Sequence, residues 1–383
     1  MTRVAGEWLT DPATQSVFAF LQEAGYQAYA VGGCVRNALL DATVADVDFA
    51  TNARPQTVTA LAQKAGLHPV PTGIEHGTVT VVSGGVGHEV TTYRKDIETD
   101  GRRAIIAFAD HLEEDAHRRD FTINALYADQ DGTVTDPLGG LADIITRRVR
   151  FIDDAGDRIR EDYLRILRFF RFHAWFGDPD AGIDPEALAA CAELAEGLES
   201  LSKERIGAEM HKLLSAPDPA PSLATMDRAG ILARILPGAN SAALTVLVHL
   251  EGEAGLPASW IRRLASLGGA NHKELLRLSK SDSRRLTLYL EQVGKTQSVA
   301  ELAYRHDAAT GIDVALLRAA MIGGPLPADL INQATISAGA KFPVRASDID
   351  SSLKGLKLGA RLKQLEADWI ASGFRLSKDE LLG

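Results

Sequence analysis

The sequence predicts an α/β (α+β) head with a small mixed β-sheet, followed by an all-α remainder. Up to about residue 150, alternating apolar and polar stretches are mixed with helical patterns. The strand candidates are 27–31, 46–51, 77–82 and 88–94. Beyond residue 158 the strand signals nearly vanish, and helical spacing covers 158–176, 184–197, 201–215 and 221–236.

Composition narrows the class of protein. At 383 residues the chain is long enough for two or three domains, and its net charge of −10 argues against a protein that coats nucleic acid non-specifically. A local basic groove stays compatible with that charge. Cys34 and Cys191 lack metal-ligand spacing, so we predict neither a zinc site nor a disulfide framework. No stretch is long enough to span a membrane and the N-terminus lacks an apolar leader, so we expect a soluble, cytoplasmic protein.

Local signals justify the elements of the head. Asp11 and Pro12 form a favourable N-cap and first-turn pair, which predicts that a helix begins there. A second helix is expected near 56–66, after another proline. Residues 95–103 are highly charged and show no apolar period, so we expect a mobile loop in that segment.

Two carboxylates stand close together in the strand candidate 46–51. The alternation of this stretch places Asp46 and Asp48 on one face, while Val47 and Phe49 point into a core. Neighbouring carboxylates repel each other unless a cation lies between them, so the pair predicts Mg²⁺ binding. Metal ions held in this way can promote an in-line displacement on phosphorus.

A glycine pair precedes these carboxylates. Gly32 and Gly33 lie between the apolar run 28–31 and a helix-like segment at 34–40. A glycine turn that opens a helix presents free N–H groups to a phosphate. Together with the carboxylates, the turn predicts a metal-dependent nucleotidyl transfer site.

Glu89 is the candidate third carboxylate of the site. It lies in the strand candidate 88–94, on the same predicted face as Thr91 and Tyr93. The alternative is a solvated charge on a strand. Adjacency of this strand to the one that carries Asp46 and Asp48 would decide between the two interpretations.

The segment 117–126 combines polar residues with an apolar run. Arg118 and Arg119 are candidates to bind a triphosphate, because guanidinium groups match phosphate oxygens. Asp120 and Asn124 could hold a ribose or brace the site. The alternative is a helix N-terminus with a solvated charge pair.

The predicted helix at 158–172 places polar residues on one face. Asp162 and Arg165 are neighbours at a spacing of three, and Arg168 and Arg171 continue the same row. Cytosine and adenine both present an amine donor beside a ring-nitrogen acceptor, which a carboxylate and a guanidinium can match. Asp162 and Arg165 could therefore select C and A, leaving Arg168 and Arg171 free for phosphates. The alternative is an amphipathic helix with solvated arginines.

With these motifs the chain resembles the class II CCA-adding enzymes, tRNA nucleotidyltransferases related to bacterial poly(A) polymerases. The resemblance is strongest over roughly residues 25–175. The matching stretches are Gly32–Asn37, Asp46–Asp48, Arg118–Ala125, Asp136–Gly140 and Glu161–Arg165.

The resemblance implies a nucleotidyltransferase head at 1–150, a helical neck with base recognition at 151–236, and an RNA-binding body and tail at 237–383. It implies that Mg²⁺ is held by Asp46 and Asp48, and that Gly33 and Arg36 touch the nucleotide. The implied activity is template-independent addition of C, C and A from CTP and ATP to the 3′ end of tRNA, with release of pyrophosphate. No stable protein partner is implied.

Two departures from the family accompany the match. Asn37 stands where the family usually has Asp, so a contact that supports the glycine turn is in doubt. His306 and Asp307 form an isolated dipeptide, and we predict none of the phosphohydrolase activity of some relatives. The basic residues near the C-terminus suit either a tRNA-binding tail or a solvated helix face; they are Lys341, Arg345, Lys354, Lys357, Arg361 and Lys363.

Three rival functions stay open at this point. A poly(A) polymerase would use the same head chemistry with ATP alone and any RNA end. An enzyme that adds only CC or only A would differ in loop details. A non-catalytic RNA-binding relative is disfavoured, because such a protein has no need for clustered carboxylates close to phosphates.

Overall fold

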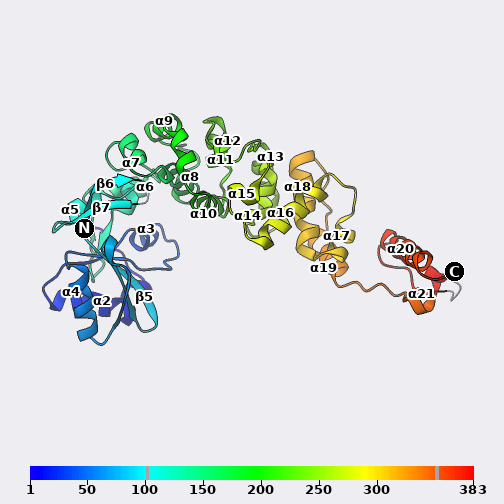
Figure 1. The fold of residues 1–383 in the computed structure, drawn as a ribbon, viewed down its shortest axis with the longest axis horizontal. Coiled ribbons are helices and arrows are strands. Elements are labelled where there is room, and N and C mark those ends of the chain that lie inside the picture. Colours follow the sequence, from blue (N-terminus) through cyan, green and yellow to red (C-terminus); the bar gives the residue numbers. More distant parts are fainter. Residues whose placement is uncertain (101–102, 350–352) are drawn as a thin grey trace. The chain divides into compact units, whose positions relative to one another are not determined.

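The computed structural model describes residues 1–100, 103–349 and 353–383. The chain forms two compact units, Met1–Ile235 and Leu236–Gly383 (Figure 1). The first unit contains a mixed β-sheet and a series of helices, and the regular elements described in the second unit are all helices. The predicted fold class is confirmed. The predicted boundary at residue 150, inside the first unit, stays a prediction.

The main sheet has seven strands among the described residues, in the order β3-β4-β5-β2-β1-β8-β9. Their bounds are β1 Ala28–Val31, β2 Phe49–Thr51, β3 His68–Gly73, β4 Thr78–Ser83, β5 Val86–Thr92, β8 Tyr127–Ala128 and β9 Val134–Thr135. Strands β2 and β5 run parallel, with Phe49 beside Val90, and the other neighbours are antiparallel. Residues at matching positions of parallel strands share a face, so Asp48 and Glu89 lie side by side.

Helices cover one face of the sheet. Helix α2 (Pro12–Glu23) and helix α4 (Pro55–Lys64) pack against β4 and β5. Asp11 caps α2 as predicted, accepting the N–H of Ala13 at 2.7 Å. Phe18 from α2 meets Phe49 edge to face, with ring centroids 4.8 Å apart. The remaining helices of the head are α1 Glu7–Thr10, α3 Gly33–Leu39, α5 Leu112–His117, α6 Gly140–Ile145 and the 3-10 turns η1 Ile74–His76 and η2 Thr122–Asn124.

The opposite face of the sheet carries a second apolar cluster. Ala50 from β2 and Tyr127 from β8 pack there with Tyr93, and Leu112 and Ala116 from α5 cover them. The cluster anchors α5 over the sheet. The segment that follows α5 therefore begins from a position that is fixed against the sheet.

The predicted strand at 46–51 is shorter in the structure, because β2 begins only at Phe49. Asp46 and Asp48 precede it, although the carbonyl of Asp48 still accepts the N–H of Val31 at 2.8 Å. Val47 and Phe49 are buried, as predicted. The alternating pattern therefore predicted correctly which residues are buried. It also covered three residues, 46–48, that precede the hydrogen-bonded strand.

The prediction of a mobile loop at 95–103 was wrong for residues 95–100 and 103, which lie in strands. Strands β6 (Arg94–Asp100) and β7 (Arg103–Phe108) form an antiparallel hairpin, and residues 101–102 lie outside the described residues. Backbone pairing from Arg94 with Phe108 onward supplies the ladder. A two-stranded ladder needs no apolar alternation in sequence, which is why the charged composition misled the prediction.

The predicted helix at 158–176 is broken into two. Helix α7 (Ala155–Glu161) ends before Asp162, which is extended at φ −157° and ψ 105°, and α8 (Leu164–Phe176) follows. The Asp162 carboxylate accepts the N–H of Leu164 at 3.1 Å, a local bond that competes with helix continuation. The helical part of the first unit continues with α9 Pro185–Glu193, η3 Ala195–Ser200, α10 Lys203–Leu214, α11 Ala220–Arg228 and α12 Ile231–Ile235.

The second unit consists of packed helices and has a charged interior. Its helices are α13 Ala242–Glu253, α14 Trp260–Leu267, α15 His272–Leu275, α16 Lys280–Val293, α17 Val299–Arg305, α18 Ala308–Ile322, α19 Leu330–Ala338, η4 Ala346–Asp348, α20 Leu356–Ala371 and α21 Lys378–Leu382. Buried Arg262 donates to Glu251 at 2.8 Å and to Asp313 at 2.6 Å, which ties α13, α14 and α18 together. Leu365 and Trp369 of α20 form a small core of their own with Val344 and Leu381.

Candidate functional site

A pocket of about 460 Å³ opens in the first unit, where the glycine turn, the segment after α5 and the start of α8 meet. Most of the predicted site residues line it: Gly32, Gly33, Arg36, Asp48, Arg118, Arg119, Asp120, Asn124, Asp162, Arg165 and Arg168. Asp46, Glu89 and Arg171 are not among the lining residues. Six arginines and three aspartates are among the described residues of its wall, so the pocket is net cationic and suits an anionic ligand.

The glycine turn joins β1 to α3. Gly32 has φ +73°, a conformation that L side chains rarely adopt. Asn37 holds the helix end that follows, because its Oδ1 accepts from Arg36 at 3.1 Å and 2.8 Å and its Nδ2 donates to the carbonyl of Thr43 at 2.9 Å. A carboxylate in place of this amide could not donate to Thr43. The departure from the family pattern thus exchanges a charge for an additional hydrogen bond.

The carboxylates lie at one side of the pocket. Asp46, Asp48 and Glu89 are all solvent-accessible, and Asp48 faces the pocket. Burial of Asp48 on the pocket side is the largest cause that raises its pKa to about 6. The charges of Glu89 and Asp46 add to this rise, whereas Arg119 lowers the pKa. The charges of Glu89 and Asp46 therefore both act on Asp48.

The donor chemistry of this group fits a divalent cation. Carboxylate oxygens are the ligands that Mg²⁺ prefers, and a cation relieves the repulsion felt by Asp48. No three His, Cys, Asp or Glu side chains converge into a preformed metal cluster anywhere in the described part of the chain. A nucleotide's phosphate oxygens commonly complete such sites.

Asp115 holds the two arginines that follow α5. It is buried and accepts from Arg118 Nε at 2.7 Å, from Arg119 Nη2 at 2.9 Å and from the Tyr127 hydroxyl at 2.9 Å. Burial would raise the pKa of Asp115, but Arg119 and Arg118 outweigh it and bring the value down to about 2. Asp115 is therefore ionised at neutral pH and orients both guanidinium groups.

A chain of polar contacts crosses the pocket floor from α8 to α3. Arg168 Nε donates to Asp120 at 2.7 Å, Asn124 donates to Asp120 at 2.9 Å, and Arg36 donates to Asn124 at 2.5 Å. The Arg36 guanidinium also lies 4.0 Å from the centroid of the Phe176 ring. Of the two roles predicted for Asp120 and Asn124, these contacts support bracing of the site.

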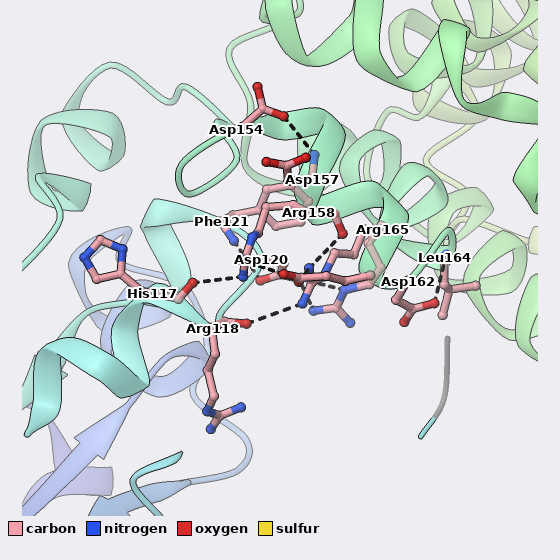
Figure 2. A network of polar contacts seen from close by, with 12 residues as sticks. His117, Arg118, Asp120, Phe121, Asp154, Asp157, Arg158, Asp162, Leu164 and Arg165 are labelled. Atoms are coloured by element: carbon pink, nitrogen blue, oxygen red, sulfur yellow. Dashed lines mark hydrogen bonds and ion pairs between the residues drawn. The ribbon is translucent and has the colours of Figure 1, made fainter. Parts of the chain in front are cut away.

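Asp162 and Arg165 lie together at the break between α7 and α8. Asp162 Oδ2 accepts from Arg205 of α10 at 2.6 Å. Arg165 contacts Glu161 and donates to the carbonyls of Arg158 at 2.8 Å and Arg118 at 3.3 Å (Figure 2). Hydrogen bonds among the described residues thus engage three of the five Arg165 N–H groups, which leaves two for a ligand.

Arg168 and Arg171 are not free, contrary to the prediction. Arg168 is paired with Asp120, and Arg171 Nε donates to buried Glu209 of α10 at 2.6 Å. Both carboxylates come from segments far away in the sequence, so the row of arginines on its own could not reveal them. Arg168 still lines the pocket, whereas Arg171 is directed toward α10.

Three contributors to the site were missed by the sequence analysis. Arg205 lines the pocket from the predicted helix at 201–215, and helical spacing alone did not distinguish it from the other basic residues there. Phe172 lines the pocket and lies under the guanidinium groups of Arg171 at 4.4 Å and Arg36 at 5.2 Å. Asp115 is one residue of an acidic run, and nothing in the sequence singles it out.

Comparisons with known proteins match this arrangement. Residues 28–150 match the family described as "Poly A polymerase head domain", and residues 182–243 match "Probable RNA and SrmB- binding site of polymerase A". CCA tRNA nucleotidyltransferase 1, mitochondrial, of Mus musculus is 34% identical, over 98% of this chain and 92% of the relative. The CCA-adding enzyme of Leuconostoc citreum is 42% identical, over 58% of this chain and 54% of the relative. The crystal structure of Bacillus stearothermophilus CCA-adding enzyme in complex with CTP superposes with a TM-score of 0.73 at 29% identity, covering 94% of each chain.

Fold and site together define a nucleotidyltransferase with a poly(A) polymerase type of head. The chain belongs to the class II CCA-adding enzymes, the CCA tRNA nucleotidyltransferases. None of the described helices is long and apolar enough to cross a membrane.

Proposed function

We propose that this enzyme adds C, C and A to the 3′ end of tRNA, using CTP and ATP and no nucleic-acid template. The observation that carries the proposal is the presence of Asp48 and the Asp162–Arg165 pair in the wall of one cationic pocket. We assign Asp48 to the transfer of the nucleotidyl group. We assign the Asp162–Arg165 pair to selection of the base. A pocket with both can transfer a nucleotide and choose it.

In this mechanism the chain binds and orients the nucleotide. Arg118 and Arg119, held by Asp115, bind the triphosphate through paired N–H groups. Asp162 retains acceptor sites for the exocyclic amine of C or A, and Arg165 retains donors for the ring nitrogen. G and U present the opposite pattern and would leave charged groups unpaired, at a cost of about 1–3 kcal/mol per group.

The tRNA 3′-hydroxyl then attacks the α-phosphate, forming the new P–O bond as pyrophosphate leaves. We assign the holding of a divalent cation, Mg²⁺, to Asp46 and Asp48, with Glu89 as the third carboxylate. When bound, the cation supplies Lewis-acid stabilisation of the negative charge that develops on the reacting oxygens. Gly32, Gly33 and Arg36 would position the nucleotide at the turn.

We assign RNA contacts to the body and tail at 237–383. The basic residues near the C-terminus are all exposed in the described structure, which supports this assignment; they are Lys341, Arg345, Lys354, Lys357, Arg361 and Lys363. We place the activity in the cytoplasm, a reducing compartment, because Cys34 and Cys191 are both free thiols.

The test supplies each nucleotide separately to a tRNA that lacks its CCA end and to a generic oligonucleotide. We expect incorporation of C from CTP, followed by A from ATP, on the tRNA alone. Long A tracts on the generic oligonucleotide would indicate a poly(A) polymerase instead. Asp46→Ala should abolish labelled CTP incorporation, and an Arg165→Ala enzyme with unchanged choice among the four nucleotides would refute the assignment of base reading.

A further inference from the structure

The position of Arg165 depends on the helix before it. Arg165 lies in the first turn of α8, beyond the break at Asp162, yet its Nη1 reaches back to Glu161 and to the carbonyl of Arg158 in α7. A helix break is a place where two segments can change their relative orientation. Contacts across the break are therefore needed to keep the guanidinium in one place.

Arg158 supplies the other half of these contacts. Its Nη2 lies 2.7 Å from Glu161 Oε1, while Arg165 takes Oε2 of the same carboxylate. Glu161 thus lies between two arginines, with one oxygen for each. The three side chains are between 12% and 21% exposed, so water competes little with these ion pairs.

Arg158 also ties α7 to the head. Its Nη1 donates to the carbonyl of His117 at 3.0 Å, and Arg165 Nη2 donates to the next carbonyl, that of Arg118, at 3.3 Å (Figure 2). Both carbonyls lie at the C-terminal end of α5, where cations are favoured. Arg118 and Arg119, which follow this end, are the proposed triphosphate ligands. One connected set of contacts therefore joins phosphate binding to base reading.

From this geometry we propose that Arg158 is a positioning residue for base selection, which sets the Arg165 guanidinium through Glu161 and the end of α5. Arg158 does not line the pocket, so it acts through Arg165 and not by touching the nucleotide. The inference rests on the proposed reading of the base by Arg165. Loss of Arg158 should lower discrimination between C and U more than it lowers catalysis as a whole.

The experiment measures kcat/KM for CTP and for UTP on a tRNA that lacks CCA, for the wild type and six variants. Arg158→Ala should reduce the CTP-to-UTP preference about tenfold, the effect expected for one displaced charge-assisted hydrogen bond. Glu161→Gln should do the same, and the double variant should add little, because both act through one contact. Arg158→Lys should recover part of the preference, since lysine can reach one of the two partners. The matched control is Arg160→Ala, which removes an exposed pair with Asp157 at 3.0 Å from the same helix.

The outcomes separate this inference from the function on which it depends. If Arg165→Ala leaves the preference intact, the assignment of base reading fails and the inference with it. If Arg165→Ala relaxes the preference while Arg158→Ala and Glu161→Gln behave like Arg160→Ala, only the role of Arg158 is refuted. A uniform loss with all nucleotides would show a structural role and also refute it. Should Arg158→Ala fail to fold, Arg158→Lys and Glu161→Gln decide the question.

Discussion

Arg205 donates a 2.6 Å hydrogen bond to the carboxylate of Asp162, across 43 residues of sequence and between α10 and the α7–α8 break. The residue proposed to accept the base's amine is thus held from behind by a cation. The contact limits the rotation of the Asp162 carboxylate. Helix α10 also carries Glu209, which accepts from Arg171. This helix therefore contacts both the α7–α8 break and α8.

We predict that Arg205→Ala lowers kcat/KM for CTP and ATP about tenfold, because Asp162 loses a charge-assisted hydrogen bond and its fixed rotamer. Steady-state addition assays on tRNA that lacks CCA measure the effect. Lys203→Ala, in the same helix but outside the pocket wall, is the control and should behave like the wild type. Equal activity of the Arg205 and Lys203 variants would contradict the role of Arg205.

Glu89 lies in β5 beside Asp48, which directly precedes β2, and its charge adds to the effect of burial in raising the pKa of Asp48. We predict that Glu89→Gln lowers kcat about a hundredfold with little change in the KM for CTP, as expected for a group needed in the chemical step. The Mg²⁺ concentration for half-maximal rate should rise as well. Glu23→Gln, on the helix that covers the other face of the sheet, is the control. An unchanged Mg²⁺ requirement in Glu89→Gln would argue for the solvated-charge interpretation.

Local patterns were sufficient to predict much of the fold. Asp11 and Pro12 predicted the start of α2, and the burial of Val47 and Phe49 followed their alternation. The hairpin of β6 and β7 was not predicted, because a two-stranded ribbon can form without a regular alternation of apolar residues in its sequence.

The candidate site shows where sequence patterns stop being sufficient. Residue types and motif spacing pointed to Asp48, Arg119 and the Asp162–Arg165 pair, all of which line the pocket. The partners of these residues could not be predicted, since a contact such as Arg171 with Glu209 joins segments 38 residues apart. A spacing of three on a helix shows which side chains are neighbours, but not what the next helix places against them.

Asp115 offers a prediction on pH. Its pKa falls from an ordinary 3.8 to about 2, since Arg119 and Arg118 outweigh burial. A lowered pKa in the folded state contributes stability above the unfolded value, and this contribution is lost as the pH falls through the folded value. Asp115→Asn should therefore cost about 3–5 kcal/mol at pH 7, the usual effect of breaking a buried ion pair. The difference in free energy of unfolding between the wild type and Asp115→Asn should become smaller between pH 4 and pH 2.

Urea unfolding of both proteins across this pH range measures the gap. Asp110→Asn is the control, because Asp110 forms an exposed pair with Arg54 and should change stability little at any pH. A gap between wild type and Asp115→Asn that stays constant from pH 7 to pH 2 would contradict an ionised Asp115 as the anchor of the two arginines.

The glycine turn provides a matched pair of substitutions. Gly32 has φ +73°, and a Cβ there would lie 3.4 Å from the carbonyl oxygen of Asn124 and 3.5 Å from Arg119 Nη1. Gly33 lacks a positive φ, and its Cβ would meet only Arg36 Nη2, at 3.8 Å. We predict that Gly32→Ala destabilises the protein by about 1–3 kcal/mol through backbone strain, whereas Gly33→Ala has a smaller effect on stability. Urea unfolding at neutral pH compares the two, and equal destabilisation would show that the strained backbone is not what selects glycine at position 32.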